Sequence, residues 1–367
     1  MIFRKSIYLQ YFLTLIILAS CSTTTRISIP NSNGVLKEGD LKKFEDIYDY
    51  QSYFVDDLEK IQKVIDSQKL DQDQLKNVKA LKRNYQKILS KKEYNLTLNL
   101  NQKYSKELIE LAYMLNLPLN IFWTESKQVS LPENLLSQKI DGFCSSLYED
   151  AISSLKKKIN KDNDSVLIIY SQEYESMIQD FESDDRNFMK AKYDSSNFQE
   201  FSAEILEINS SDKRFKKISS LNPNQNLNFT PRPRYDFKQI IILLNSQEYK
   251  SMIPALRYHG SNKFEYLNFI SSLEAINTPL QLLDYEDSWA PISVRTISKI
   301  QKDELQSLER YLELGVLNEW LLLQILNQAG VQSARVNGTT GRIIYRSNAC
   351  TKREIPLKKI STNLFLS

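Results

Sequence analysis

Two nearly continuous apolar runs constrain the fold of this chain more than any other feature. They read SVLIIY at 165–170 and QIIILL at 239–244, and each is flanked by segments with helical spacing. A strand that is apolar on both faces has to be buried on both faces, which is typical of a mostly parallel sheet covered by helices. We therefore expect an α/β fold over residues 93–367.

Each apolar run is followed by almost the same eight residues. The first copy is SQEYESMI at 171–178 and the second is SQEYKSMI at 246–253. Both should be strand-to-helix turns, in which Ser171 and Ser246 cap the helix and the Tyr, Met and Ile residues share one buried face. This pattern favours a structural joint. A binding role stays open, because ligands of open α/β sheets lie beyond the carboxyl ends of the strands.

The remaining elements are predicted from hydrophobic spacing. Residues 38–92 indicate a helical hairpin, interrupted at 68–73, whose second helix is capped by Asp71 or Asp73. Further strands are predicted at 94–100, 119–123, 188–193, 264–269, 281–285 and 342–345, and helices at 105–115, 149–159, 198–208, 303–314 and 317–328.

The first 20 residues read as a targeting signal. Arg4 and Lys5 precede an apolar stretch that is short for a membrane span, and the stretch ends in Leu-Ala-Ser before Cys21. This arrangement resembles a bacterial lipobox, in which the cysteine is acylated and becomes the first residue of the mature chain. A plain signal peptide is the alternative. Residues 21–37 form a polar tether, and by resemblance to sorted lipoproteins Ser22 favours the outer membrane.

Composition narrows the function classes. The chain holds 48 basic and 45 acidic residues, and loss of Arg4 and Lys5 would leave it nearly neutral, so we expect no nucleic-acid partner. Eight glycines form neither a GxGxxG nor a GxxxxGK[ST] motif, and no cofactor is expected. Cys144 and Cys350 would remain after processing, and they could form a disulfide in an oxidising compartment, although their spacing does not settle it.

No catalytic residue can be assigned from the sequence. His259 is the single histidine, which argues against a Ser-His-Asp triad and a multi-histidine metal site; we predict neither a catalytic nor a metal site. Residues 173–185 carry six acidic side chains, and residues 335–359 carry seven basic ones against Glu354. Both runs are expected to be solvated surface, with contact between the basic region and an acidic partner as the sharper alternative.

Several phrases resemble the penicillin-binding-protein activator lipoproteins of the LpoA type. The most specific runs from Arg232 and Arg234 through the apolar strand to PALRYHG at 254–260. DYEDSWAPI at 284–292 is similar to an Asp-x-Pro-Trp segment of that family, and NGTTGRIIY at 337–345 is similar to its Gly-Ala-Thr-Gly hairpin, with Gly338 and Gly341 in the turn. GFCSSLYEDA at 142–151 is similar to the phrase that opens the crossing into the second lobe. The family's N-terminal helical repeats are reduced here to 38–92.

The resemblance implies a type I periplasmic-binding-protein-like fold, with a reduced first lobe and a more complete second lobe. It implies a non-catalytic outer-membrane lipoprotein that binds and stimulates a class A penicillin-binding protein, with peptidoglycan as a further partner. Trp289, a large amphipathic side chain in a polar segment, is the candidate contact residue, and a core position is its alternative. A lipid-anchored solute receptor is the second hypothesis, and a cell-wall hydrolase the third.

Overall fold

The computed structural model describes residues 58–67, 70–99, 102–115, 117–125, 131–159, 165–182, 188–194, 197–221, 228–260, 263–302 and 305–361. Contacts divide the chain into Met1–Leu41 and Lys42–Ser367, so all of these residues belong to the second unit. The expected signal peptide, Cys21 and the tether lie outside the described residues.

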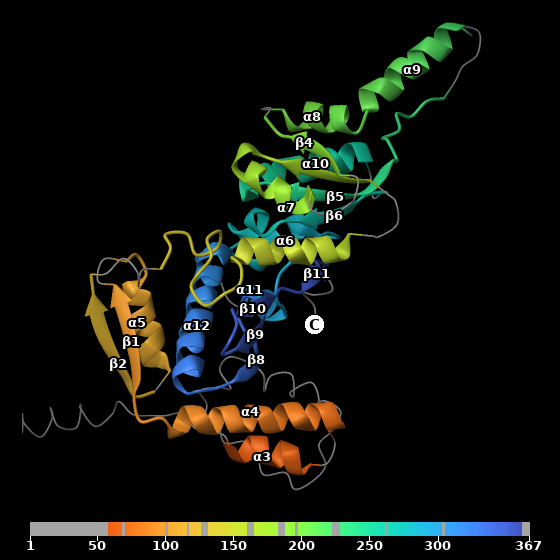
Figure 1. The fold of residues 1–367 in the computed structure, drawn as a ribbon. Helices are drawn as coiled ribbons and strands as arrows, with labels where there is room; N and C mark the ends of the chain where they lie inside the picture. Colours follow the sequence, from red (N-terminus) through yellow and green to blue (C-terminus); the bar gives the residue numbers. More distant parts are fainter. Residues whose placement is uncertain are drawn as a thin grey trace, which may run out of the picture. The chain divides into compact units, whose positions relative to one another are not determined.

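A six-stranded sheet forms the centre of the described structure (Figure 1). Its strands are β3 (Ser165–Tyr170), β4 (Phe188–Lys192), β5 (Phe237–Leu243), β6 (Glu265–Asn268), β7 (Trp289–Pro291) and β11 (Leu357–Lys359). They lie in the order β11-β7-β6-β5-β3-β4, and every neighbouring pair is parallel except β11 with β7. The apolar runs predicted β3 and β5, two neighbouring strands inside the sheet, because only a doubly covered strand can bury so many apolar side chains.

Helices alternate with these strands along the chain. They are α6 (Leu147–Lys158), α7 (Ile178–Glu182), α8 (Phe198–Ile205), α9 (Ile208–Leu221), α10 (Ser246–Gly260), α11 (Val294–Lys302) and α12 (Leu308–Gln328). α6 packs beside α7 and α8 beside α10. Right-handed crossovers place these two pairs on opposite faces of the sheet. The predicted α/β class with a mostly parallel sheet is confirmed.

A small antiparallel sheet follows α12. It consists of β8 (Ser333–Asn337), β9 (Arg342–Arg346) and β10 (Lys352–Glu354). Gly338 donates its backbone N–H to the Gly341 carbonyl at 2.7 Å, so the two glycines form the predicted hairpin turn. A Cβ atom placed on Gly315 of α12 would lie 2.7 Å from Thr339 Cγ2, so glycine is needed where this helix meets the turn.

The region that was expected to form a reduced first lobe contains a strand-helix-strand unit. β1 (Tyr94–Asn99) and β2 (Leu119–Thr124) are parallel, and α5 (Ser105–Met114) connects them. At the other edge of β1 the Gln328 side chain accepts from Asn95 N at 2.8 Å and donates to Asn95 O at 2.6 Å. A side chain of α12 thus takes the place of a third strand at this position.

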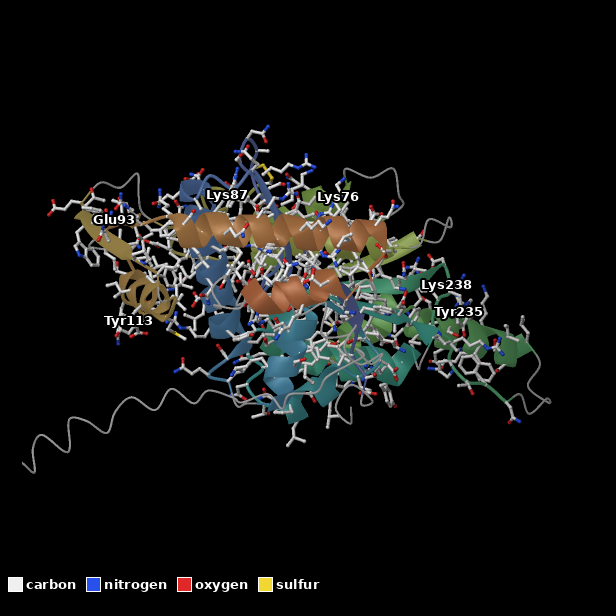
Figure 2. The ribbon with its side chains drawn as sticks, turned by 90° about the horizontal axis from the view of Figure 1, so that it is seen from below. Lys76, Lys87, Glu93, Tyr113, Tyr235 and Lys238 are labelled. Atoms are coloured by element: carbon white, nitrogen blue, oxygen red, sulfur yellow. A yellow bond between two sulfur atoms is a disulfide. The ribbon has the colours of Figure 1, made fainter. Side chains whose placement is uncertain are left out.

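The predicted helical hairpin is described from residue 58 onward. It consists of α3 (Leu58–Asp66) and α4 (Gln72–Ser90), and residues 38–57 lie outside the described ranges. Asp71 caps α4 in a reciprocal capping box with Gln74, which confirms one of the two predicted caps. Lys87 donates to the Gly330 carbonyl at 2.9 Å and so ties α4 to the end of α12; Figure 2 shows Lys87 and Lys76 along α4.

Two element predictions are wrong. The strand expected at 281–285 belongs to a 3-10 helix, Pro279–Tyr285. Pro279 fixes a helical φ at the first position, and Leu282 and Tyr285 are buried at a spacing of three, which suits a 3-10 helix rather than a strand. The helices expected at 303–314 and 317–328 are one helix, α12, because Gly315 packs closely on Thr339 instead of ending the helix.

Candidate functional site

The carboxyl edge of β3 and β5 is the position where this fold would take a ligand. From β3 the chain crosses first to β4 and then back past β3 to β5, so the direction of winding reverses between β3 and β5. Ligands of open α/β sheets bind at such a switch point. Tyr170 pairs with Leu243 at the ends of the two strands, so both copies of the repeated octapeptide begin side by side at this edge.

The two copies form different helices. The first is a 3-10 helix, Gln172–Met177, in which Ser171 makes no capping hydrogen bond. The second begins α10, where Asn245 Oδ1 accepts from Gln247 N at 3.0 Å and Glu248 N at 2.9 Å. The predicted serine caps are therefore wrong. Asn245 caps the second copy, while the Ser246 hydroxyl donates to the Ser271 carbonyl at 3.1 Å, which ties α10 to the loop after β6.

Aromatic side chains of the protein fill the switch point. Tyr148 at the start of α6 lies 4.9 Å from Phe269, and Tyr174 of the first copy lies 5.9 Å from the same ring, both edge to face between ring centroids. Phe269 is fully buried and the two tyrosines are nearly so. Edge-to-face pairs of this kind stabilise a packed core. The space next to the strand ends is occupied by the protein itself.

The Glu274 carboxyl group lies at the same edge of the sheet, and its pKa is raised. The Tyr148 hydroxyl donates to Glu274 Oε1 at 2.5 Å. Burial raises the pKa of Glu274 to about 7, and the hydrogen bond from Tyr148 opposes this effect. The charges of Glu309, Glu173 and Glu313 raise this pKa further. Glu274 therefore exchanges its proton near neutral pH within an acidic environment. The sequence contains no local signal that marks this residue.

The first turns of α12 bridge the switch point and the β1–α5–β2 unit. On one side, Glu309 N donates to the Glu274 carbonyl at 2.9 Å. On the other, the Tyr104 hydroxyl donates to Glu313 Oε1 at 2.6 Å, and Arg310 of α12 pairs with Glu107 of α5. Buried ion pairs and hydrogen bonds of this kind are costly to break singly. The first turns of α12 therefore hold the β1–α5–β2 unit to the elements at the switch point.

Trp289 lies in the sheet. It opens β7, and its ring lies under Lys158 Nζ, with 4.1 Å between the nitrogen and the ring centroid. The indole is partly buried and packs against the core. This position is close to the alternative given above, a core residue below a loop, and the contact role of Trp289 stays a prediction.

Cys144 and Cys350 form a disulfide in the structure. It links the loop before α6 to the loop between β9 and β10, where Cys144 N donates to the Thr351 carbonyl at 2.9 Å. Beside it, the buried Arg353 guanidinium pairs with Asp150 at 3.1 Å and with Glu319 at 3.1 Å. Arg353 belongs to the basic run expected at the surface, so part of that run stabilises the interior instead.

Hollows among the described residues also lie outside the switch point. One lies beneath Phe143 and Arg353 and is too small to admit a water molecule. The other is an open groove of about 490 Å³ between α3 and α4. Its lining consists of Gln62, Ile65, Lys79, Lys82, Arg83 and Gln86. The groove is cationic, and its basic side chains extend from one face of α4.

His259 lies in the last turn of α10 and stacks edge to face on Tyr258. In the part of the chain that the structure describes, no three His, Cys, Asp or Glu side chains are placed to hold a metal ion. Within the same ranges no helix combines the length and the apolar composition needed to cross a membrane.

No protein-family model matches the sequence, and no curated protein matches it either. Among solved structures, the fold is similar to that of a solute-binding protein of an ABC transporter from Rhodopseudomonas palustris BisB5, crystallised in complex with 3,4-dihydroxybenzoic acid. The two chains are 7% identical, the match covers 73% of this chain and 93% of that chain, and the TM-score is 0.39.

Proposed function

We propose that this protein is a non-catalytic envelope lipoprotein that acts by docking on a class A penicillin-binding protein and stimulating it. Support comes from the phrases that resemble the LpoA-type activators, above all residues 232–260 and the hairpin at 337–345. Stimulation would be a coupling free energy, because the regulator has to bind the active state of the synthase more tightly than its resting state.

The filled switch point is the observation that favours docking over the capture of a small solute. A solute receptor needs a largely preformed pocket that buries most of its ligand. Here Tyr148, Tyr174 and Phe269 occupy the corresponding volume, and Glu274 and Glu309 join the elements on either side. A packed edge suits a rigid body that presents its outer surface to a partner.

Location and chemistry complete the proposal. Acylation of Cys21 would hold the chain on the outer membrane, facing the periplasm, because two or more acyl chains anchor stably. The single histidine and the missing nucleophile and phosphate motifs support a role without catalysis. A disulfide between Cys144 and Cys350 is typical of an oxidising compartment and so supports a periplasmic location.

Reconstitution with the synthase tests this function. The acylated chain and a class A penicillin-binding protein of the same cell are combined in detergent, and both binding and the rate of glycan polymerisation are measured. We expect saturable binding and a rate that rises with the occupied fraction. The chain with Cys21→Ala, expressed in the cell, should no longer incorporate labelled palmitate.

Three results would contradict the proposal in different ways. Absence of binding to any class A synthase removes the docking function. A shift of the melting temperature by a small solute, without a protein partner, supports the solute receptor. Turnover of peptidoglycan by the purified chain alone would show that it is a hydrolase.

A further inference from the structure

The helix α9 and the segment that returns from it form an arm at one end of the main sheet (Figure 1). We define the α9 arm as residues 207–221 and 228–236. The main contact of α9 with another element is with α8, the helix that precedes it. Most of the surface of α9 is therefore available to something outside the described chain.

Specific contacts give the arm a defined structure. Phe215 of α9 stacks on Phe229 of the returning segment, with 4.1 Å between ring centroids. Nearer the sheet, Arg232 N donates to Ser211 Oγ at 3.3 Å and Arg234 N donates to the Leu206 carbonyl at 3.0 Å. The inner face of α9 therefore packs against the returning segment. The other faces of the helix take no part in these contacts.

Those remaining faces are strongly cationic. α9 carries Lys213, Arg214, Lys216 and Lys217 against the single Asp212, an excess equal to the formal net charge of +3 of the whole chain. Asp212 pairs with Lys216 at 2.8 Å. Lys213, Arg214 and Lys217 are exposed and have no ion-pair partner among the described residues. At 3.6 residues per turn the four cations cover roughly 160° of the helix circumference.

The far end of the helix is apolar. Ile218 is 57% exposed and Leu221 is 77% exposed, and both follow the cations in the sequence. With a rise of 1.5 Å per residue, Leu221 lies about 12 Å beyond Lys213 along the helix axis. A single exposed aliphatic residue is ordinary on a protein surface. Two of them at the end of a cationic helix are a pattern that membrane-surface helices also show.

We propose that the α9 arm binds an anionic lipid surface. The broad band of cations would meet the headgroup phosphates, while Ile218 and Leu221 would enter the interface, which amphipathic segments penetrate by about 5–10 Å. The cations lie on one side of the helix, within roughly 160° of its circumference, and the apolar residues lie beyond them along the axis. This sequence of cations and then apolar residues matches the layered order of headgroup and acyl chain.

This inference is independent of the proposed docking function. It also does not depend on acylation of Cys21, although the arm would then supply the second of two membrane signals. Such an arm would hold one particular end of the main sheet against the membrane. The faces at the other end would point toward the periplasm.

Vesicle flotation with the mature polypeptide, residues 22–367, tests the proposal without interference from acyl chains; this polypeptide contains every described element. The probes are phosphatidylcholine vesicles with and without about one third phosphatidylglycerol, at low ionic strength and at about 0.3 M salt. We expect binding to the anionic vesicles at low salt, weakening as salt is added, and binding to neutral vesicles at least about tenfold weaker.

The variant that reverses Lys213, Arg214 and Lys217 to Glu should lose at least about 100-fold in partition, since each cation near an anionic surface contributes about fivefold. Ile218→Ser with Leu221→Ser should weaken binding several-fold at every salt concentration. The matched control reverses Lys63, Lys76 and Lys139, which are exposed on other parts of the chain, and makes the same change in net charge. It should bind like the unaltered chain.

Either of two results overturns the inference. One is equal partition of the unaltered chain into anionic and neutral vesicles. The other is an equal loss of binding in the α9 variant and in the control, which would assign the effect to net charge rather than to the arm. The comparison of anionic with neutral vesicles uses only the unaltered chain, so the test stands even if a variant fails to fold.

Discussion

Three buried charged side chains, Arg353, Asp150 and Glu319, pair with one another near the disulfide. Arg353 is 6% exposed and Glu319 fully buried, and the Thr340 hydroxyl also donates to Glu319 at 2.7 Å. Asp150 completes the group, and burial raises its pKa despite the nearby guanidinium. One cation thus balances two buried carboxyl groups, so each partner depends on the others.

Replacement of Arg353 should be strongly destabilising. Arg353→Met keeps much of the side-chain length but leaves two buried carboxyl groups without their cation, and we expect a loss of about 3–5 kcal/mol in the free energy of unfolding. Arg346→Met, at an exposed position of β9, should change it by less than about 0.5 kcal/mol. Urea denaturation at neutral pH measures both. Similar losses of unfolding free energy in the two variants would mean that the buried ion pairs do not stabilise the fold more than an exposed arginine does.

Glu274 should make stability depend on pH near neutrality. Its pKa is about 7 in the folded chain and near its ordinary value of 4.5 in the unfolded chain, so between these values the folded state binds more protons. The stability that the protonated group contributes is therefore complete below about pH 4.5 and is lost as the pH rises to 7. At 1.36 kcal/mol per pKa unit the loss is at most about 3 kcal/mol.

Glu274→Gln should remove this slope, because the amide is always neutral and can still accept from the Tyr148 hydroxyl. Unfolding midpoints at a series of pH values between 5 and 7.5 are compared for the two chains. Glu133→Gln, which removes an exposed carboxyl group, serves as control and should keep the slope. Parallel pH profiles for the unaltered chain and Glu274→Gln would count against a buried, protonated Glu274.

Secondary-structure elements depend on their neighbours as much as on their own residues. The repeated octapeptide forms a 3-10 helix after Tyr170 and a regular α-helix after Asn245. The difference lies in the preceding residue, because asparagine accepts hydrogen bonds from the first helical N–H groups and tyrosine cannot. Nearly identical local sequence, with Glu175 in one copy and Lys250 in the other, is thus not sufficient for identical local structure.

The repeat supplies its own matched pair of variants. Asn245→Ala should cost about 0.5–2 kcal/mol, the usual effect of losing a helix cap. Ser171→Ala should cost far less, because the Ser171 hydroxyl makes no capping hydrogen bond. Chemical denaturation of the two variants side by side is the measurement. A larger loss for Ser171→Ala than for Asn245→Ala would reverse the assignment of the caps.

Across the whole molecule, long-range ties hold the ends of the α/β region together. The disulfide joins residues 206 positions apart, and backbone hydrogen bonds of Thr351 to Gly142 and Cys144 lie beside it. α12 connects the small antiparallel sheet, the switch point and the β1–α5–β2 unit. The disulfide and the contacts of α12 therefore help to hold the elements around one continuous hydrophobic core.

Loss of the disulfide should destabilise the whole α/β region. Replacement of Cys144 and Cys350 by Ser frees a loop of about 200 residues in the unfolded chain, and a cost of about 2–5 kcal/mol is expected. Reductant should lower the unfolding midpoint of the unaltered chain by a similar amount and leave that of the double variant unchanged. A double variant as stable as the oxidised chain would show that the disulfide does not stabilise the fold.

Local signals in the sequence were enough for part of this description. The break in hydrophobic spacing at 68–73 predicts a helix capped by Asp71 or Asp73, and Asp71 is the cap in the structure. Six consecutive residues carry the signal for the strand at 165–170. The segment 281–285 was misread because a short apolar run has the same composition in a strand and in a 3-10 helix, and only burial at every third residue separates them.

The spacing of apolar and polar residues is enough to predict that the chain alternates strands and helices around buried apolar strands, because hydrogen bonds and side-chain spacing within a few residues carry that information. Tertiary structure alone decided the order of the strands and the joining of Cys144 to Cys350. It also decided the burial of Arg353 with Asp150, the filling of the switch point by Tyr148 and Phe269, and the exposure of one face of α9. Each of these depends on residues far apart in the chain, whose approach is set by how the layers pack.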